Sequence, residues 1–315
     1  MVICETVSYG YIRKASLKPW DSISENIQTC TGNDFVIDSQ QSIGGGCINE
    51  AYKITGKTVP GKKVQTWFVK LNQANGLEMF EAEHRGLQEM ADTNAIRVPN
   101  PLCSGIAENK SYLIMEYIEL TSRGADPLQL GQQFAAMPKV TKDQFGYVCE
   151  NTIGSPPPIN PPVKYCLTFW QKHRLGFQLQ LASRKGGGRN LQRKGEQLVC
   201  RFSALFTNYQ PKASLLHGDQ WGGNCSGDDE GNPVIYDPAV YYGDHEADLA
   251  MTELFGGFGG NFYSAYAEVF PVDAGYPVRK ILYNLYHILN HFNLFGGGYA
   301  TQAESMIDQL LAELG

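Results

Sequence analysis

The sequence predicts an α+β fold in two lobes, a small β-rich N-terminal lobe and a larger, mostly helical C-terminal lobe. Strand-like segments are concentrated in the first third of the chain, whereas helical patterns dominate after residue 163. A length of 315 residues favours about two domains, and 43% hydrophobic residues are enough for a full core. We therefore expect an N-terminal lobe over residues 1–117 and a C-terminal lobe over residues 118–315.

The N-terminal lobe is predicted to begin with a helix near residues 20–28, because Trp20, Ile23 and Ile27 have the spacing of one helical face. The VPNPLCSGI segment begins with a proline-broken turn and leads into strands that end in YLIMEYIEL. Between the first helix and this segment, strands are expected near residues 35–43, 50–55 and 65–71, followed by a helix near residues 77–92.

The C-terminal lobe contains one segment, NTIGSPPPINPP, that cannot form a helix or a central strand, so we expect a long loop there. The chain turns helical from Val163, and KGGGRN at residues 185–190 interrupts this pattern. The runs DHEADLAMTELF and VRKILYNLYHILNHFNLF are predicted helices. Glycines 296–298 should end the second.

The most informative segment is LLHGDQWGGNCSGDDEGNPVIYDPA, which contains His217, Asp219, Asn224 and Asp237. We expect a hairpin here, with one strand ending at residues 215–216 and the other at residues 234–236. An HxDxxxxN motif with a second Asp thirteen positions after the Asn is the pattern of a kinase active site. In that pattern the first Asp accepts the proton of the substrate hydroxyl, and the Asn and second Asp hold magnesium. Polar loop residues often only stabilise turns, but all four at this spacing indicate a phosphotransferase.

The predicted nucleotide-binding loop is SIGGGCINEAYKIT, in which Gly44, Gly45, Gly46 and Cys47 lie between two strands. Glycines there allow the backbone to approach phosphates and to direct N–H groups at them. The run lacks the Gly-Lys-Ser/Thr of a Walker A loop. Considered alone, a run of three glycines more often forms a simple hairpin turn.

Lys70, in the strand-like run TWFVKLN, has apolar neighbours and therefore needs an anionic partner. In the following helix, Glu83 lies within the apolar stripe, whereas Glu81 lies on the polar face and can pair with Arg85. We expect a Lys70–Glu83 ion pair that positions the α- and β-phosphates.

The strand that follows should carry the hinge between the lobes. We expect the backbone near Glu116, Tyr117 and Ile118 to face the adenine of the nucleotide.

Charge and hydropathy exclude several classes of partner. A net charge of −6 provides no electrostatic footprint for nucleic acid. No apolar run reaches eighteen residues, so we expect no membrane span, and the N-terminus lacks the features of a signal peptide. Eight cysteines without CxxC pairs suit reduced thiols. We therefore expect a cytoplasmic protein.

Taken together, these motifs resemble the fructosamine kinases, also called ketosamine-3-kinases, within the aminoglycoside- and choline-kinase-like branch of the protein-kinase-like fold. The resemblance extends from about Ser42 to the last helix. Two positions depart from the family pattern: Gln220 stands where leucine is expected, and Glu150 where aspartate is usual. The matching runs are GGGCIN, FVKLN, MFEAE, VPNPL, NTIGS, LLHGDQWGGN, PVIYDPAVYYGDHEADLAMTELFGGF and LYNLYHILNHFNLFGGGY.

The resemblance implies phosphorylation of O3 of ketoamines, the products of sugars with amines, using ATP and magnesium (Mg2+). Loss of the 3-phosphate would then release the free amine. Asp219 would be the catalytic residue, Asn224 and Asp237 the magnesium ligands, and Lys70 with Glu83 the phosphate-positioning pair. We also expect Trp221 and His217 near the substrate, although a buried core position is an equal alternative for Trp221.

Cys47 suggests regulation, because a thiol among inward-facing N–H groups can have a lowered pKa. We expect redox sensitivity at Cys47 and a homodimer formed through it; an inert thiol is the alternative. Asp244, Glu246 and Asp248, at the start of a predicted helix, are expected to be structural, by capping the helix or tying down the catalytic loop.

Two rival functions stay open from sequence. One is a related small-molecule kinase acting on an aminoglycoside, choline or an amino sugar. The other is a catalytically silent nucleotide-binding scaffold, against which the intact Lys70, Asp219, Asn224 and Asp237 argue. A protein kinase is disfavoured because no APE-type segment follows Asp237.

Overall fold

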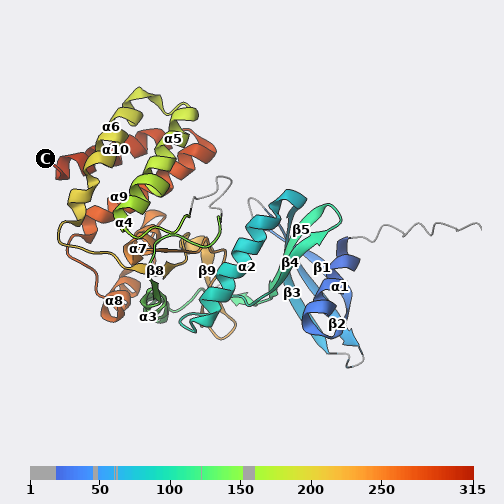
Figure 1. The fold of residues 1–315 in the computed structure, drawn as a ribbon. Helices are drawn as coiled ribbons and strands as arrows, with labels where there is room; N and C mark the ends of the chain where they lie inside the picture. Colours follow the sequence, from blue (N-terminus) through green and yellow to red (C-terminus); the bar gives the residue numbers. More distant parts are fainter. Residues whose placement is uncertain (1–18, 45–48, 60, 62, 122, 152–159) are drawn as a thin grey trace, which may run out of the picture.

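A computed structural model describes residues 19–44, 49–59, 61, 63–121, 123–151 and 160–315. The chain forms a β-rich N-terminal lobe and a mostly helical C-terminal lobe, as the sequence predicts (Figure 1). Gly45, Gly46 and Cys47 lie outside the described residues, as does most of the proline-rich segment. The expectations for Cys47, including the homodimer, therefore stay predictions.

The N-terminal lobe is a five-stranded antiparallel sheet in the order β1-β2-β3-β5-β4. The predicted helices and strands are confirmed, with boundaries that differ by a few residues. The elements are α1 (Pro19–Thr31), β1 (Asp34–Ile43), β2 (Glu50–Val59), β3 (Val64–Gln73), α2 (Leu77–Asp92), β4 (Pro101–Ala107) and β5 (Lys110–Glu116).

The two faces of this sheet are buried in different ways. On one face, Ile23 and Ile27 of α1 pack in a small core with Ile54 and Val69. On the other, the apolar stripe of α2 joins the core of the C-terminal lobe, so α2 lies between the sheet and the helices (Figure 1). Helix α2 is therefore placed by contacts with both lobes.

The C-terminal lobe is built around α9 (Tyr276–Phe295), whose buried face runs along most of its length. The predicted interruption near residues 185–190 is confirmed, since one helix ends at Arg184 and the next begins at Gly188. Gly296 ends α9 with a φ of 67°, a conformation that favours glycine. The other helices are α3 (Pro127–Ala136), α4 (Cys166–Phe169), a π-helical turn (Trp170–Leu175), α5 (Gly176–Arg184), α6 (Gly188–Arg201), α7 (His245–Leu254), α8 (Gly260–Val269) and α10 (Tyr299–Glu313).

Two small sheets of the C-terminal lobe correct the predicted hairpin. β8 (Ala213–Leu216) does not pair with the strand that precedes Asp237; it lies between β7 (Thr141–Lys142) and β11 (Tyr241–Gly243). The hairpin is formed instead by β9 (Cys225–Asp228) and β10 (Pro233–Ile235), and β6 (Leu120–Thr121) pairs with β9. The prediction was wrong because strand partners depend on long-range packing, which a local pattern does not encode.

Within the described part of the chain, no helix is long and apolar enough to cross a bilayer. The cytoplasmic location stays a prediction. The boundary predicted at residues 117/118 falls in the segment between β5 and β6, where the chain passes from one sheet to the other.

Candidate active site

Asp219 lies in the loop between β8 and β9, shortly after β8, a fully buried strand that ends at Leu216. The residue before it, Gly218, has a φ of 83°, and a Cβ there would lie 2.1 Å from the carbonyl oxygen of Ala239. Only glycine meets both conditions without strain. The tight turn that presents Asp219 therefore depends on this glycine.

His217 stabilises the same loop through hydrogen bonds of its ring. Its Nε2 lies 3.0 Å from the carbonyl oxygen of Tyr236, which can only accept, so Nε2 carries the proton. Its Nδ1 accepts the backbone N–H of Asp219 at 3.3 Å. Burial lowers the pKa of His217 to about 4, which keeps the ring neutral. With no exposed surface and both ring nitrogens in use, His217 is a structural support, which corrects its expected substrate contact.

Asp248, in α7, also stabilises this loop, by accepting hydrogen bonds from its backbone. Its carboxylate accepts the backbone N–H of His217 at 2.6 Å and that of Gly218 at 2.8 Å. Burial raises the pKa of Asp248 to about 7, and the two N–H donors oppose this shift. The prediction that this acid ties down the catalytic loop is confirmed.

Asp219 contacts Asn224, whose Nδ2 donates to the carbonyl oxygen of Asp219 at 2.8 Å and to its Oδ2 at 3.2 Å. Burial raises the pKa of Asp219 to about 7. The hydrogen bond from Asn224 opposes this increase, whereas the charges of Asp237 and Asp248 add to it. The amide thus fixes the orientation of the carboxylate.

Lys70 of β3 forms an ion pair with one residue in each lobe. Its Nζ lies 2.5 Å from Oε1 of Glu83 and 2.6 Å from Oδ1 of Asp237. Burial alone would disfavour the ammonium, but these two carboxylates raise the pKa of Lys70 above its ordinary value. The choice of Glu83 over the exposed Glu81 is confirmed as the partner of Lys70.

A cavity of about 590 Å³ lies between the lobes and collects most of the predicted residues. Phe68, Met115 and Val234 add apolar walls that sequence reasoning did not identify, although alternation along β3 and β5 indicates that such side chains face one side of the sheet. Asp219 does not line this cavity and is linked to it through Asn224. The predicted residues that line it are Gly44, Lys70, Glu116, Tyr117, Ile118, Trp221, Asn224 and Asp237.

Trp221 also lines this cavity, and 40% of its side chain is exposed. The core alternative for this tryptophan is therefore wrong. A Cβ on Gly223 would lie 2.3 Å from the indole ring, so the absence of a side chain at Gly223 lets the ring lie against the loop.

Glu89, near the end of α2, was missed from the sequence. It accepts hydrogen bonds from Lys142 at 2.6 Å and from the hydroxyls of Tyr147 and Tyr242 at 2.7 Å each. All three donors belong to the C-terminal lobe. Glu83 therefore connects α2 to Lys70 at the cavity, and Glu89 connects α2 to the C-terminal lobe. No local sequence pattern links Glu89 to these distant donors.

Asn224 and Asp237 present an amide and a carboxylate, the hard oxygen ligands that magnesium prefers. Among the described residues, no cluster of three or more His, Cys, Asp or Glu side chains could hold a metal ion. Two protein ligands are nevertheless sufficient, because magnesium at kinase sites keeps waters and binds phosphate oxygens. Asp237 is half-exposed toward the cavity with a φ of 58°, so this donor set fits the predicted cofactor.

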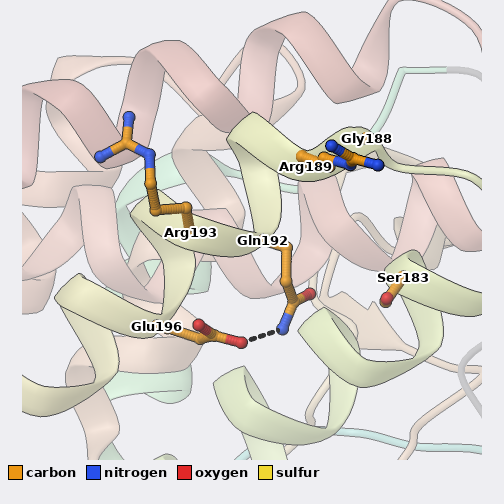
Figure 2. A pocket seen from close by; sticks show the side chains of 6 residues that line it. All are labelled: Ser183, Gly188, Arg189, Gln192, Arg193 and Glu196. Carbon is orange, nitrogen blue, oxygen red and sulfur yellow. Dashed lines mark hydrogen bonds between the residues drawn. The ribbon is translucent and has the colours of Figure 1, made fainter.

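A second cavity, of about 440 Å³, is lined by polar residues of α5 and α6 (Figure 2). Gln192 and Glu196 at this cavity are joined by a 2.7 Å hydrogen bond. None of the predicted site residues lines it. The chemistry is therefore assigned to the cavity between the lobes.

The interlobe site defines a phosphotransferase of the kinase class. It combines the Lys70–Glu83 pair, the loop with Asp219 and Asn224, and the second acid, Asp237. The model of the fructosamine kinase family matches residues 19–313. The chain belongs to this family and is a kinase.

Individual relatives agree with this assignment. A probable ketoamine kinase of Synechocystis sp. is 47% identical, over 93% of this chain and 97% of its own. The chloroplastic protein-ribulosamine 3-kinase of Arabidopsis thaliana is 43% identical, over 93% of this chain and 89% of its own.

Solved structures extend the comparison. A protein of Haemophilus somnus, provisionally named fructosamine-3-kinase, has a TM-score of 0.81 at 29% identity, covering 93% of this chain and 97% of its own. An aminoglycoside phosphotransferase has a TM-score of 0.62 at 14% identity, covering 92% of this chain and 98% of its own. The second likeness shows the shared kinase-like fold alone.

Proposed function

We propose that this protein transfers the γ-phosphoryl group of ATP to the O3 hydroxyl of ketoamines, with magnesium as cofactor. The observation that carries the proposal is the Asp219–Asn224 loop beside an Asp237 held by Lys70. The matched family and relatives named ketoamine kinase and protein-ribulosamine 3-kinase support the substrate class.

Asp219 is proposed to orient the sugar hydroxyl and to accept its proton as the oxygen attacks phosphorus. Proton transfer comes late in a loose transition state, so positioning matters more than basicity. His217, Asp248 and Asn224 fix this carboxylate from three directions. A carboxylate with this support needs little reorganisation at the moment of reaction.

Lys70 is proposed to bind the phosphates while Glu83 holds its side chain in place. Asn224 and Asp237 would ligate magnesium, which neutralises charge that develops on the phosphate oxygens. The 2.6 Å contact between Lys70 and Asp237 places the two phosphate-binding elements side by side. Phe68, Met115 and Val234 provide apolar surface for the adenine.

The chemistry after transfer needs no further residue of this chain. A 3-phosphate is a better leaving group than hydroxide, and enolisation of the neighbouring ketone toward C1 lets it depart from C3. Water then releases the amine and leaves a deoxyosone. The biological consequence is deglycation of amines or proteins.

The alternative functions are less well supported. Kinases of aminoglycosides share the fold at low identity, whereas the fructosamine kinase model covers nearly the whole chain. A silent scaffold is disfavoured because Lys70, Asp219, Asn224 and Asp237 are all present in one site.

The decisive experiment gives purified protein ATP, magnesium and ketoamines derived from glucose, ribose and a smaller sugar, together with an aminoglycoside and choline. Phosphorus NMR should place the new phosphate on O3 of a ketoamine, and Asp219→Asn should form this product at least about 10²-fold more slowly. Phosphorylation of the aminoglycoside or choline alone, or at another hydroxyl, would disprove the proposal.

A further inference from the structure

Arg97, in the segment between α2 and β4, contacts an acid in each lobe. Its guanidinium donates to Oε1 of Glu116, at the end of β5, at 2.9 Å, and also to the carboxylate of Asp228 in β9. Its backbone carbonyl oxygen accepts the N–H of Ile235 in β10 at 3.1 Å. One residue therefore joins the sheet of the N-terminal lobe to the β9–β10 hairpin of the C-terminal lobe.

This hairpin carries both proposed magnesium ligands. Asn224 directly precedes β9, and Asp237 follows the last residue of β10 by two positions. The N–H of Tyr236 donates to the carbonyl oxygen of Asn224 at 3.1 Å, which keeps the two ends of the hairpin side by side. A shift of the hairpin as one unit would therefore move both ligands together.

Asp228 fixes the turn at the other end of the hairpin, and only 2% of its side chain is exposed. Its Oδ1 accepts the backbone N–H groups of Glu230 at 3.1 Å and Asn232 at 2.8 Å, and its Oδ2 accepts from Arg97. Burial alone would raise the pKa of Asp228, but hydrogen bonds from Asn232 and then from Arg97 lower it below its ordinary value. Arg97 therefore pairs with a buried, charged carboxylate that belongs to the turn itself.

Glu116 connects Arg97 to the end of the cavity where we expect the adenine. Its Oε2 accepts the backbone N–H of Asn100 at 3.2 Å and the side-chain Nδ2 of Asn100 at 2.8 Å. Both carboxylate oxygens of Glu116 thus have protein partners, while Glu116, Tyr117 and Ile118 line the cavity. The side chain of Glu116 holds the hinge in place and leaves the backbone of the hinge for the nucleotide.

We infer that Arg97 is a positioning residue that sets the distance between the adenine end and the magnesium end of the nucleotide site. The inference rests on the proposed function and deepens it, because one ATP molecule must reach both ends at once. Arg97 does not line the cavity, so it acts through Glu116 and the hairpin. Its planar guanidinium holds two carboxylates in one fixed geometry, which the ammonium of a lysine does not provide.

The test compares the affinities of two ligands by calorimetry. Adenosine occupies the adenine end alone, whereas the magnesium complex of the non-hydrolysable ATP analogue AMP-PNP spans both ends. Arg97→Gln should weaken binding of the magnesium complex at least about fivefold and binding of adenosine less than about twofold, because only the spanning ligand depends on the alignment. Arg97→Lys should show the same selective loss. Lys110→Gln, which removes an ion pair with Glu50 inside the N-terminal lobe, is the matched control and should change neither affinity.

A second variant breaks the same link from the N-terminal side. Glu116→Ala should reproduce the selective loss, and it keeps the inference testable if Arg97→Gln does not fold. The double variant Arg97→Gln/Glu116→Ala should bind the magnesium complex within about twofold of either single variant, because the two substitutions remove one shared link and their effects should not add.

Three results would overturn this inference. The first is an unchanged affinity for the magnesium complex in both single variants, and the second is an equal loss for both ligands, which would mean that Arg97 only stabilises the fold. The third is a loss in the double variant that equals the sum of the two single losses in free energy. If the unaltered protein does not bind the magnesium complex, the proposed function itself fails, and this result is distinct from the other three.

Discussion

The Nζ of Lys70 lies 2.6 Å from Oδ1 of Asp237, although 167 positions separate them in the chain. The contact joins β3 of the N-terminal lobe to the segment after β10 of the C-terminal lobe. Closing so large a loop is entropically unfavourable, so packing elsewhere must hold the lobes together. Helix α2 provides that packing, since its apolar stripe belongs to the core of the C-terminal lobe.

Replacing the lysine of this contact tests its role. Lys70→Met should lower kcat/KM about 10²- to 10³-fold because the phosphates lose a buried charged donor. Steady-state kinetics with ATP as the varied substrate measures the effect. Lys57→Met, at an exposed lysine paired with Asp38, is the control and should change kcat/KM less than twofold. Equal kinetics for the two variants would contradict the assignment.

The proposed base has a separate signature. Asp219→Asn should lower kcat about 10²- to 10⁴-fold, since the amide cannot accept the hydroxyl proton. The dissociation constant for ATP, measured by calorimetry, should stay within about threefold, because Asp219 does not line the cavity. Turnover near that of the unaltered enzyme would refute the role of Asp219.

Glu89 should affect stability and activity by positioning α2, and not by contacting the substrate. Glu89→Ala removes three hydrogen bonds to the C-terminal lobe and should lower the free energy of unfolding by about 2 kcal/mol. The KM for ATP should rise, because Glu83 lies on the same helix. Urea denaturation and kinetics measure the two effects. Glu81→Ala, at an exposed site of α2, should leave both unchanged; similar losses in the two variants would mean that the anchoring contacts contribute nothing.

Gln220 is a buried polar residue that we expect to reduce the stability of the folded protein. Its side chain is buried, and neither amide atom has a hydrogen-bond partner among the described residues. Gln220→Leu should therefore raise the free energy of unfolding by about 1–2 kcal/mol, with kcat within twofold. Thermal denaturation provides the measurement.

Gln178→Leu is the matched control for this substitution. Gln178 is equally buried but hydrogen-bonds Asn293 and Asn290, so the same change should destabilise the protein. If Gln220→Leu is the more damaging of the two, the interpretation of Gln220 is wrong.

His217 gives a prediction for pH. Burial lowers its pKa in the folded protein to about 4, below the ordinary value reached on unfolding. The stability that depends on its neutral form is therefore complete above about pH 6.5 and is lost as the pH falls through about 4. The loss is at most about 3 kcal/mol.

Nitrogen NMR of histidine-labelled protein checks this directly, with the signal assigned by its absence in His217→Gln. The Nε2–H tautomer should persist down to about pH 5. A midpoint near 6.5 would show that the ring is not held between Tyr236 and Asp219.

Most of the proposed chemistry could be predicted from the sequence. The spacing of Asp219, Asn224 and Asp237 indicated the two acids and the amide, and the apolar stripe of α2 distinguished Glu83 from Glu81. The structure pairs Lys70 with Glu83 and places Asn224 and Asp237 at one cavity, and these placements were predictable because helical periodicity and motif spacing are local properties. The N-terminal elements were predictable for the same reason.

Contacts between distant segments were decided only by the tertiary structure. Long-range packing determines the partner of β8, the burial of His217, the exposure of Trp221 and the anchoring of Glu89. The local sequence around a residue does not show whether its side chain is buried or exposed. Sequence alone therefore determined which chemical groups this protein carries, and long-range packing decided which of them meet and which face solvent.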